Sequence, residues 1–328
     1  MTAGQTTERT DGPGETPTGD SRWVDLNGPV HYLDFGGPAD GPVIVCVHGL
    51  GGSAVNWAAV GPLLTGTCRV LAPDLAGHGL TQSLGRGTDV GSNRALLHRF
   101  VMSVTGGPVI LMGNSMGGMI SLLEASAAPA AVAGLVLVDP ALPFVPARPD
   151  PLVTAMFAAY LTPGLRRAVQ AQRRHQVPAD LVSSTLRLCC ADPSRVAPEV
   201  IARHVEVAVQ RAAFPTIEAD FAAAMRSVVR TIGYPHGRAY GRQVRSVTCP
   251  VLLIHGTADR LVPIAAARAA IRANPAWSLR EFGGVGHVPQ LEVPRDTADA
   301  VLGWLGSAGQ RAARAAQAAN TPGLHTDG

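Results

Sequence analysis

The stretch VILMGNSMGGMI, residues 109–120, decides the fold, because it joins two apolar runs through a serine between glycines. The first run is typical of a buried strand, and the residues after Ser115 are typical of a helix. Gly113 and Gly117 carry no side chain, so strand and helix can approach closely there. Such a turn strains the serine backbone and presents its hydroxyl at the strand end, as in a nucleophile elbow. The plainer alternative is a glycine-rich turn with a solvated serine.

Short apolar runs that end in Gly, Asp or Ser recur on both sides of this turn. They cover residues 30–35, 42–49, 69–79, 134–140 and 250–259, and one more strand is expected at 278–282. Helical patterns lie between these runs, for example at 89–104 and 263–273. This alternation predicts an α/β fold with a mostly parallel, doubly wound sheet.

The alternation stops at residue 143, and the segment 143–247 contains no strong strand pattern. It has the pattern of several helices separated by prolines: 151–161, 164–176, 178–190, 198–213 and 215–232. We therefore expect a helical cap at 143–247, inserted into an α/β core formed by 21–142 and 248–308. Residues 1–20 are rich in Thr, Gly and acidic side chains and are predicted to be disordered. The segment 309–328 is predicted to be a flexible C-terminal tail.

Composition narrows the class of protein. The chain has 328 residues, of which 46% are hydrophobic and 16% charged, with a net charge of +3, which suits a globular protein with a sizeable core. No window reaches the roughly 18 unbroken apolar residues of a membrane helix, and no Lys/Arg run is present. We expect no stable membrane insertion and no nucleic-acid partner. The N-terminus lacks a signal-peptide pattern, and the five cysteines show no metal-ligand spacing, which predicts free thiols, no metal and a cytoplasmic location.

A nucleophilic serine needs a base, and the base needs an orienting acid. Asp259 follows a buried strand in HGTADRLVP, and His287 lies in the glycine-rich segment FGGVGHVPQLEVP after the last strand. Polar groups at the carboxyl ends of parallel strands gather at one edge of the sheet. Ser115, Asp259 and His287 are therefore predicted to form a catalytic triad. Taken singly, each has a plainer interpretation as a turn or loop residue.

The early segment VCVHGLGGS is the candidate for the second half of an oxyanion hole. Backbone N–H groups of Leu50 and Met116 are the predicted donors. His48 is expected to be structural, and Trp57 is expected to be core or pocket wall. Asp74 is expected to hold the next strand-end turn together.

The cap is expected to face the serine and to select the substrate. Its apolar side chains predict an apolar acyl or alcohol group, although packing within the cap is the plainer interpretation of any single one. The candidate substrate-binding residues are Trp57, Phe144, Met156, Phe157, Tyr160, Phe214 and Phe221.

Five motifs together resemble the α/β-hydrolase superfamily over about residues 22–307. They are HGLGGS at 48–53, PDLAGHG at 73–79, GNSMGG at 113–118, HGTAD at 255–259 and GHVPQLEVP at 286–294. The resemblance implies an esterase- or lipase-like serine hydrolase with a helical cap. Such an enzyme cleaves a small-molecule carboxylic ester through an acyl-enzyme and needs no cofactor.

The same resemblance leaves alternatives. Members with an aspartate nucleophile are excluded by Ser115. Hydrolysis of a carbon–carbon bond, a lactone or a thioester uses the same triad, although Val288 stands where carbon–carbon hydrolases typically carry Trp. The elbow also resembles that of cofactor-free haloperoxidases or perhydrolases. A receptor-like member that binds a small molecule without turnover is the non-enzymatic alternative. The oligomeric state and the natural substrate are not predicted.

Overall fold

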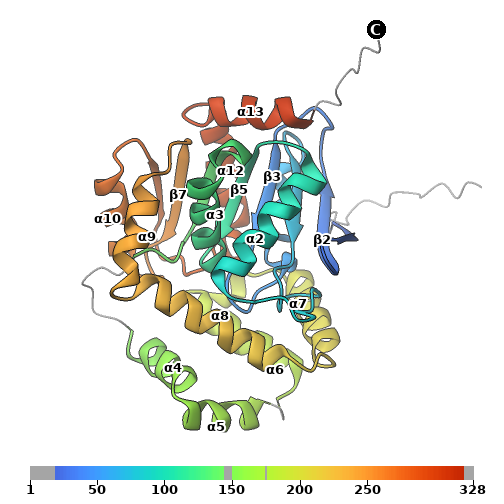
Figure 1. Ribbon diagram of the computed structural model, residues 1–328, viewed down its shortest axis with the longest axis vertical. Helices are drawn as coiled ribbons and strands as arrows, with labels where there is room; N and C mark the ends of the chain where they lie inside the picture. The colour runs from blue at the N-terminus through green and yellow to red at the C-terminus, as the bar shows by residue number, and fades with distance from the viewer. Residues whose placement is uncertain (1–18, 144–149, 174–175, 321–328) are drawn as a thin grey trace, which may run out of the picture.

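The computed structural model describes residues 19–143, 150–173 and 176–320, and its centre is an eight-stranded sheet (Figure 1). The strand order is β1-β2-β4-β3-β5-β6-β7-β8; β2 pairs antiparallel with β1 and β4, and the other pairs are parallel. This confirms the predicted α/β-hydrolase fold with a mostly parallel sheet. The strands are β1 (Asp20–Asp25), β2 (Pro29–Gly36), β3 (Val43–Val47), β4 (Arg69–Pro73), β5 (Val109–Asn114), β6 (Val132–Val138), β7 (Val251–Gly256) and β8 (Ser278–Phe282).

Helices cover both faces of the sheet, because alternate strand residues point to opposite sides. Val43, Val45 and Val47 of β3 belong to one buried cluster, and Ile44 and Cys46 belong to the other. The first face is covered by α2 (Val90–Phe100), α3 (Met116–Ala127), α9 (His236–Arg245) and α10 (Ile264–Ala273). The second face is covered by the short η1 (Ala54–Trp57), α1 (Gly61–Leu64), α12 (Pro294–Leu305) and α13 (Gln310–Asn320).

Five further helices fill most of the insertion between β6 and β7. They are α4 (Pro151–Leu161), α5 (Pro163–Arg173), α6 (Pro178–Cys189), α7 (Pro198–Arg211) and α8 (Ile217–Ile232). The first four begin with proline, whose fixed φ and missing N–H suit the first helical position. Figure 1 shows α4 and α5 at the end of the molecule opposite α13, with α8 between them and the sheet. Segment 143–247 stays our proposed cap, although its last helix, α9, covers the first face of the sheet as a core helix does.

The strand β1 and the helix α9 have no counterpart in the sequence-based prediction. The edge strand β1 is exposed along most of its length, so it lacks the apolar pattern of a buried strand. Helix α9, HGRAYGRQVR, has two glycines and three arginines, yet it buries Tyr240 and Val244 against the core. The Tyr240 hydroxyl donates to the carbonyl of Ala141 at 2.8 Å, which ties α9 to the end of β6.

The prediction of a flexible tail at 309–328 is wrong for residues 310–320, which form α13. Ala312 is buried, and a Cβ placed on Gly134 of β6 would lie 2.6 Å from the Ala312 Cβ. Because Gly134 has no side chain, α13 can pack directly on the sheet at this position. The contact joins residues that are far apart in the sequence. Residues 321–328, and residues 1–18 of the predicted N-terminal disorder, lie outside the described residues.

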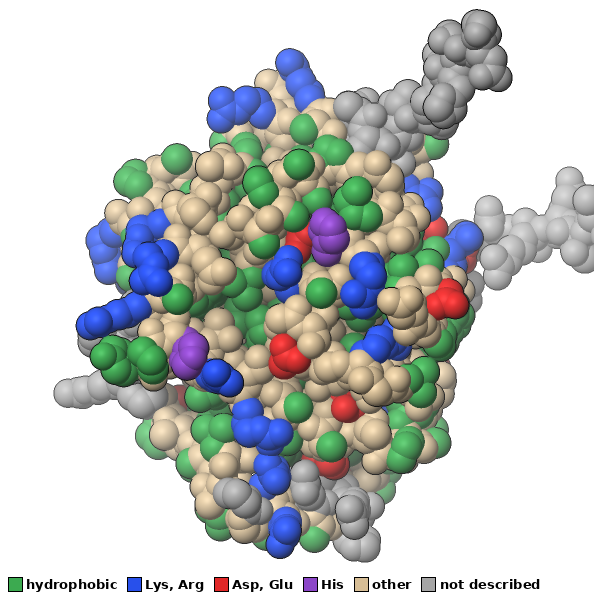
Figure 2. Space-filling view, in the orientation of Figure 1, with side chains coloured by type: hydrophobic (Ala, Val, Ile, Leu, Met, Phe, Trp, Pro, Cys, Tyr) green, Lys and Arg blue, Asp and Glu red, His purple; other side chains and the backbone are tan. Residues whose placement is uncertain are grey.

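The distribution of charged side chains on the surface agrees with the modest net charge. Figure 2 shows arginine side chains distributed over the whole visible face among neutral and hydrophobic ones. Within the described ranges, no helix has both the length and the apolar character needed to cross a membrane.

Candidate active site

Ser115 occupies a strained turn between β5 and α3. Its backbone angles are φ 54° and ψ −116°, outside the regions that L-residues favour. Its N–H donates to the Val138 carbonyl at 3.1 Å, and its carbonyl accepts from Met119 and Ala141. Strain of this kind costs about 1–3 kcal/mol and persists only where surrounding bonds hold it. The residue therefore has the backbone expected of a nucleophile elbow.

Two glycines make this turn possible. A Cβ on Gly113 would lie 2.5 Å from the Gly117 carbonyl oxygen, and a Cβ on Gly117 would lie 2.1 Å from the carbonyl oxygen of Val47. Both distances are too short for real atoms, so β3, β5 and α3 leave no room for a side chain at either glycine beside Ser115. The quoted stretch thus needs glycine at both positions for a steric reason.

We predict that Gly117→Ala destabilises the protein, because the added methyl group meets backbone rather than a movable side chain. Overpacking of this kind costs typically about 1–3 kcal/mol. The matched control is Gly303→Ala in α12, where nothing lies within 4 Å of the added carbon. Alanine is the better helix former by up to about 1 kcal/mol, so the control should gain stability. Urea denaturation of both variants checks the opposite signs, and a neutral Gly117→Ala contradicts the steric reading.

The loop after β3 lies against the serine. A Cβ on Gly49 would lie 3.1 Å from the Ser115 Cβ. His48 holds this loop: its Nε2 accepts from the Leu75 N–H, so Nδ1 carries the proton and donates to the Gly49 carbonyl at 2.8 Å. Burial lowers the pKa of His48, which keeps this ring neutral. The contacts agree with the structural role expected for His48.

The two predicted oxyanion donors are free. Among the described residues, neither the N–H of Leu50 nor the N–H of Met116 has a hydrogen-bond acceptor. Met116 is the first residue of α3, where helix N–H groups have no intrahelical partner and the helix dipole favours negative charge. Both N–H groups can therefore still donate to a ligand oxygen, as an oxyanion hole requires.

His287 and Asp259 form a direct pair. Nδ1 of His287 lies 2.7 Å from Oδ2 of Asp259, and the other oxygen, Oδ1, accepts from the N–H groups of Leu261 and Val262. Burial alone would raise the pKa of Asp259, but the hydrogen bond and charge of His287 outweigh it and hold that pKa below its usual value. Because a carboxylate can only accept, Nδ1 carries the proton and Nε2 of a neutral ring keeps its lone pair.

Asn114 joins this pair to the elbow. Its side-chain amide donates to the carbonyl of His287 and to the carbonyl of Val138, each at 3.0 Å. The residue before Ser115 thus binds the backbone of His287, although 173 positions separate them in sequence. No hydrogen bond connects the Ser115 hydroxyl to His287 within the described residues. The triad stays a prediction, in which the acid and the base are in contact and Asn114 ties the backbone of the base to the elbow.

Glu292 binds the loop after β8 that carries His287 (the histidine loop), and the sequence analysis missed this residue. Its buried carboxylate accepts from the N–H of Gly286 at 2.9 Å and from the N–H groups of Ala191 and Asp192, each at 3.1 Å. The N–H of His287 itself donates to the carbonyl of Cys189 at the end of α6. The histidine loop is therefore bound to the insertion. The motif GHVPQLEVP contains Glu292, but the local sequence does not indicate which groups the carboxylate would bind.

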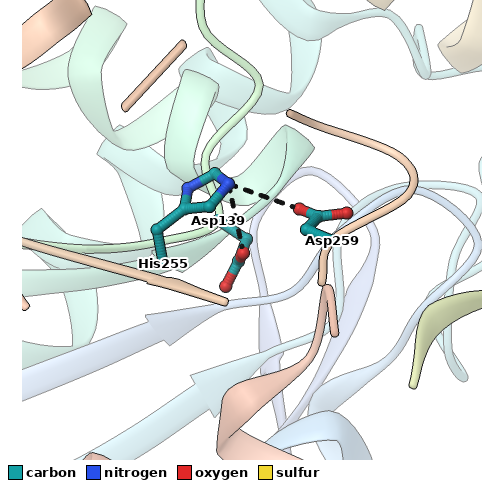
Figure 3. A group of neighbouring side chains, drawn as sticks. All are labelled: Asp139, His255 and Asp259. Carbon is teal, nitrogen blue, oxygen red and sulfur yellow. Dashed lines mark ion pairs between the residues drawn. The ribbon is translucent and has the colours of Figure 1, made fainter. Parts of the chain in front are cut away.

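A second acid lies behind Asp259. Figure 3 shows Asp139 and His255 beside it, and the potential ligand atoms of the three side chains lie within 4.8 Å of one another. Asp139 follows β6 with φ 43°, and its Oδ1 accepts from the Gly256 N–H at 3.0 Å. His255 directs Nε2 at the Val262 carbonyl at 2.9 Å, so that nitrogen carries a proton and is not free to bind a cation. Burial and the neighbouring Asp259 charge raise the pKa of Asp139 well above its usual value, which favours its neutral form.

This raised pKa predicts a pH-dependent stability effect of Asp139→Asn. Between the ordinary value of 3.8 and the raised folded-state pKa, the folded protein binds more protons than the unfolded chain, so stability falls as pH rises. Asparagine keeps the acceptor for Gly256 and removes this proton. The variant should therefore gain stability relative to wild type with increasing pH, by at most about 1.4 kcal/mol per pH unit. Urea denaturation from pH 4.5 to 8 measures the difference, and parallel curves contradict the assignment.

Phe221, one of the predicted pocket residues, lies against the loop after β3 that contains Leu50 (the oxyanion loop), and Tyr160 packs on Phe221. A Cβ on Gly51 would lie 3.0 Å from the Phe221 ring, and this ring meets Tyr160 edge-on at 5.2 Å between centroids. Phe157 and Phe214 are half-buried. Phe144 and the side chain of Met156 lie outside the described residues. Trp57 is fully buried in the cluster on the second face of the sheet, as its core interpretation expects.

Comparison of the sequence and the structure with known proteins identifies the family of the chain. The alpha/beta hydrolase family model matches residues 44–300, so the chain belongs to that family. It is 30% identical over 272 residues, which is 78% of this chain and 95% of the other, to pimeloyl-[acyl-carrier protein] methyl ester esterase of Aromatoleum aromaticum. Lipase LipV of Mycobacterium tuberculosis is 33% identical over 41% of this chain and 52% of its own length. A crystal structure of a putative lipase from Acinetobacter baumannii superposes with a TM-score of 0.71 at 21% identity, covering 90% and 93% of the two chains.

Proposed function

We propose that this α/β hydrolase is a serine carboxylesterase that cleaves a small-molecule ester with an apolar acyl or alcohol group. The observation that carries the proposal is the His287–Asp259 pair, bound through Asn114 to the strained Ser115. Relatives named as an esterase and a lipase support ester chemistry. The aromatic pair Tyr160 and Phe221 beside the oxyanion loop supports an apolar substrate group.

In the proposed mechanism, the lone pair on Nε2 of His287 takes the proton of Ser115 as the hydroxyl oxygen attacks the acyl carbon. Asp259 holds the proton on Nδ1 and stabilises the imidazolium that forms. The oxyanion is bound by the N–H groups of Leu50 and Met116. His287 then protonates the leaving alcohol, and water repeats the sequence on the acyl-enzyme. No step requires a metal or organic cofactor.

The location is proposed from the cysteines. All five are free thiols, and burial raises the pKa of each, for example that of Cys189 to about 12. Buried, protonated thiols without a disulfide suit a reducing compartment, which supports the cytoplasm.

The test combines turnover with site-resolved labelling. Wild type is assayed on p-nitrophenyl esters from acetate to octanoate, and a fluorophosphonate probe is mapped to individual serines by peptide mass spectrometry. We expect turnover that varies with chain length, together with a label on Ser115. A protein that neither turns over any ester nor carries the label on Ser115 overturns the proposal. Tight binding of an ester by such a protein would then favour the receptor-like alternative.

A further inference from the structure

A second Ser–His–Asp chain lies near the β1 edge of the sheet, on β1, β2 and the end of β4. Oγ of Ser21 is 2.9 Å from Nε2 of His31, and Nδ1 of His31 is 2.7 Å from Oδ2 of Asp74. Its connections have the order of a catalytic triad: hydroxyl to Nε2, and Nδ1 to carboxylate. Of the two sites, only this one has all of its links within hydrogen-bond distance.

The acid of this chain is held in its ionised form. Asp74 is buried, and besides His31 it accepts from the N–H of Ala54 at 2.6 Å and from the N–H of Leu80 at 2.7 Å. Burial alone would raise the pKa of Asp74, but the hydrogen bond and charge of His31 outweigh it and hold that pKa below its usual value. Gly79 is required here, since a Cβ on it would overlap the Asp74 carboxyl group. Asp74 thus has the turn-holding role expected from the sequence, and it also binds a histidine.

The hydrogen-bond partners determine which ring nitrogen of His31 carries the proton. The ionised carboxylate can only accept, so Nδ1 is the donor. In the neutral ring Nε2 then has a free lone pair, and the Ser21 hydroxyl must donate to it. The backbone of His31 is bound on both sides, its N–H to the Thr81 hydroxyl and its carbonyl to the Asp74 N–H. The base is therefore fixed in both tautomer and orientation.

The serine is accessible, unlike its base. His31 is 3% exposed, whereas Ser21 lies on the exposed edge strand. Trp23 is two residues further along β1, hence on the same face, and it is the register partner of His31. Its ring is 53% exposed and meets the His31 ring edge-on at 5.1 Å. A flat aromatic group can stack on this indole beside the hydroxyl.

We propose that Ser21 is a second nucleophilic serine, activated by His31 and Asp74, that is acylated by activated esters with an aromatic leaving group. The Ser21 proton passes to Nε2 of His31 as Oγ forms its bond to the acyl carbon. The bond from that carbon to the aryl oxygen breaks, and the leaving aryloxide takes the proton from His31. A fluorophosphonate reacts in the same sense, with a new P–O bond and departure of fluoride. This activity goes beyond the proposed function, since no group of the Ser115 site takes part.

The experiment uses the full-length Ser115→Ala variant, so that the first site is silent. Tryptic peptides resolve the question, because Ser21 is the single serine of residues 10–22 and Ser307 is the single serine of residues 296–311. Ser307 is the matched control: it is exposed and hydrogen-bonded to the Gly303 carbonyl, with no histidine partner. After exposure to a fluorophosphonate probe, we expect Ser21 to carry at least tenfold more label than Ser307.

The base is tested by adding His31→Gln, which can still bond to Asp74 but cannot accept the serine proton as a base. We expect its Ser21 label to fall to the level of Ser307. If this variant does not fold, as judged by circular dichroism, the ratio of Ser21 to Ser307 in Ser115→Ala alone decides. Equal labelling of the two serines in Ser115→Ala overturns the proposal, and the chain then only ties β1 to the sheet. An unlabelled Ser115 in wild type would instead count against the proposed esterase.

Discussion

Replacing Ser115 with alanine lowers kcat for p-nitrophenyl ester hydrolysis by about 10⁴- to 10⁶-fold, the range expected when a triad loses its nucleophile. The elbow should survive, because its geometry depends on backbone bonds to Val138 and Ala141 and on Gly113 and Gly117 rather than on the hydroxyl. The loss should therefore appear in kcat while the fold and the affinity for substrate persist. Steady-state kinetics together with circular dichroism separate these effects.

The control for this variant is Ser307→Ala. It removes an exposed hydroxyl in the turn between α12 and α13 and should leave kcat unchanged. The residual rate of Ser115→Ala should be lowered further by Ser21→Ala if the second serine contributes. A Ser115→Ala, Ser21→Ala double variant that keeps more than a tenth of the wild-type rate would contradict the assignment of Ser115 as the nucleophile.

The second large effect is expected from Asp259→Asn, with a loss in kcat of about 10⁴-fold. Asparagine is close in shape, so the bonds from Leu261 and Val262 to Oδ1 can remain. Its amide can donate to Nδ1 of His287, which places the ring proton on Nε2 and leaves no lone pair for the serine. The variant should thus fold normally and lose catalysis through the wrong tautomer.

Asp40→Asn serves as the matched exposed control and should retain wild-type activity. Kinetics on the same ester and thermal unfolding of both variants complete the comparison. A loss smaller than tenfold in Asp259→Asn would assign the acid to another carboxyl group, and Asp139 behind it would be the first to examine.

Much of the fold was predictable because its signals are local. Buried parallel strands are continuous apolar runs, and β3, β5, β6 and β7 have that pattern. The elements that the sequence analysis missed lack it. The strand β1 is exposed, α9 is rich in glycine and arginine, and α13 depends on the space above Gly134.

The residues of the candidate site were likewise predictable only in part. Ser115, Asp259 and His287 could be selected because each follows an apolar run, at the position where parallel sheets present polar groups. Asn114 and Glu292 stand inside the same motifs but act on backbone groups distant in sequence, so their partners are invisible there. Asp139 follows β6 in an equivalent position, and its raised pKa comes from its burial and from the neighbouring Asp259 charge, which only the folded chain provides.

The sequence by itself determined most of the order of strands and helices and the glycine-bordered turn at Ser115, and it predicted the acid and base that follow later strands. These features depend on residues that are neighbours along the chain or on a repeated apolar pattern. Only the tertiary structure decided which histidine meets which carboxylate, and it brought Ser21, His31 and Asp74 together as well as Asp259 and His287. The reason is that a hydrogen bond requires atoms about 3 Å apart, and only packing of distant segments sets that distance.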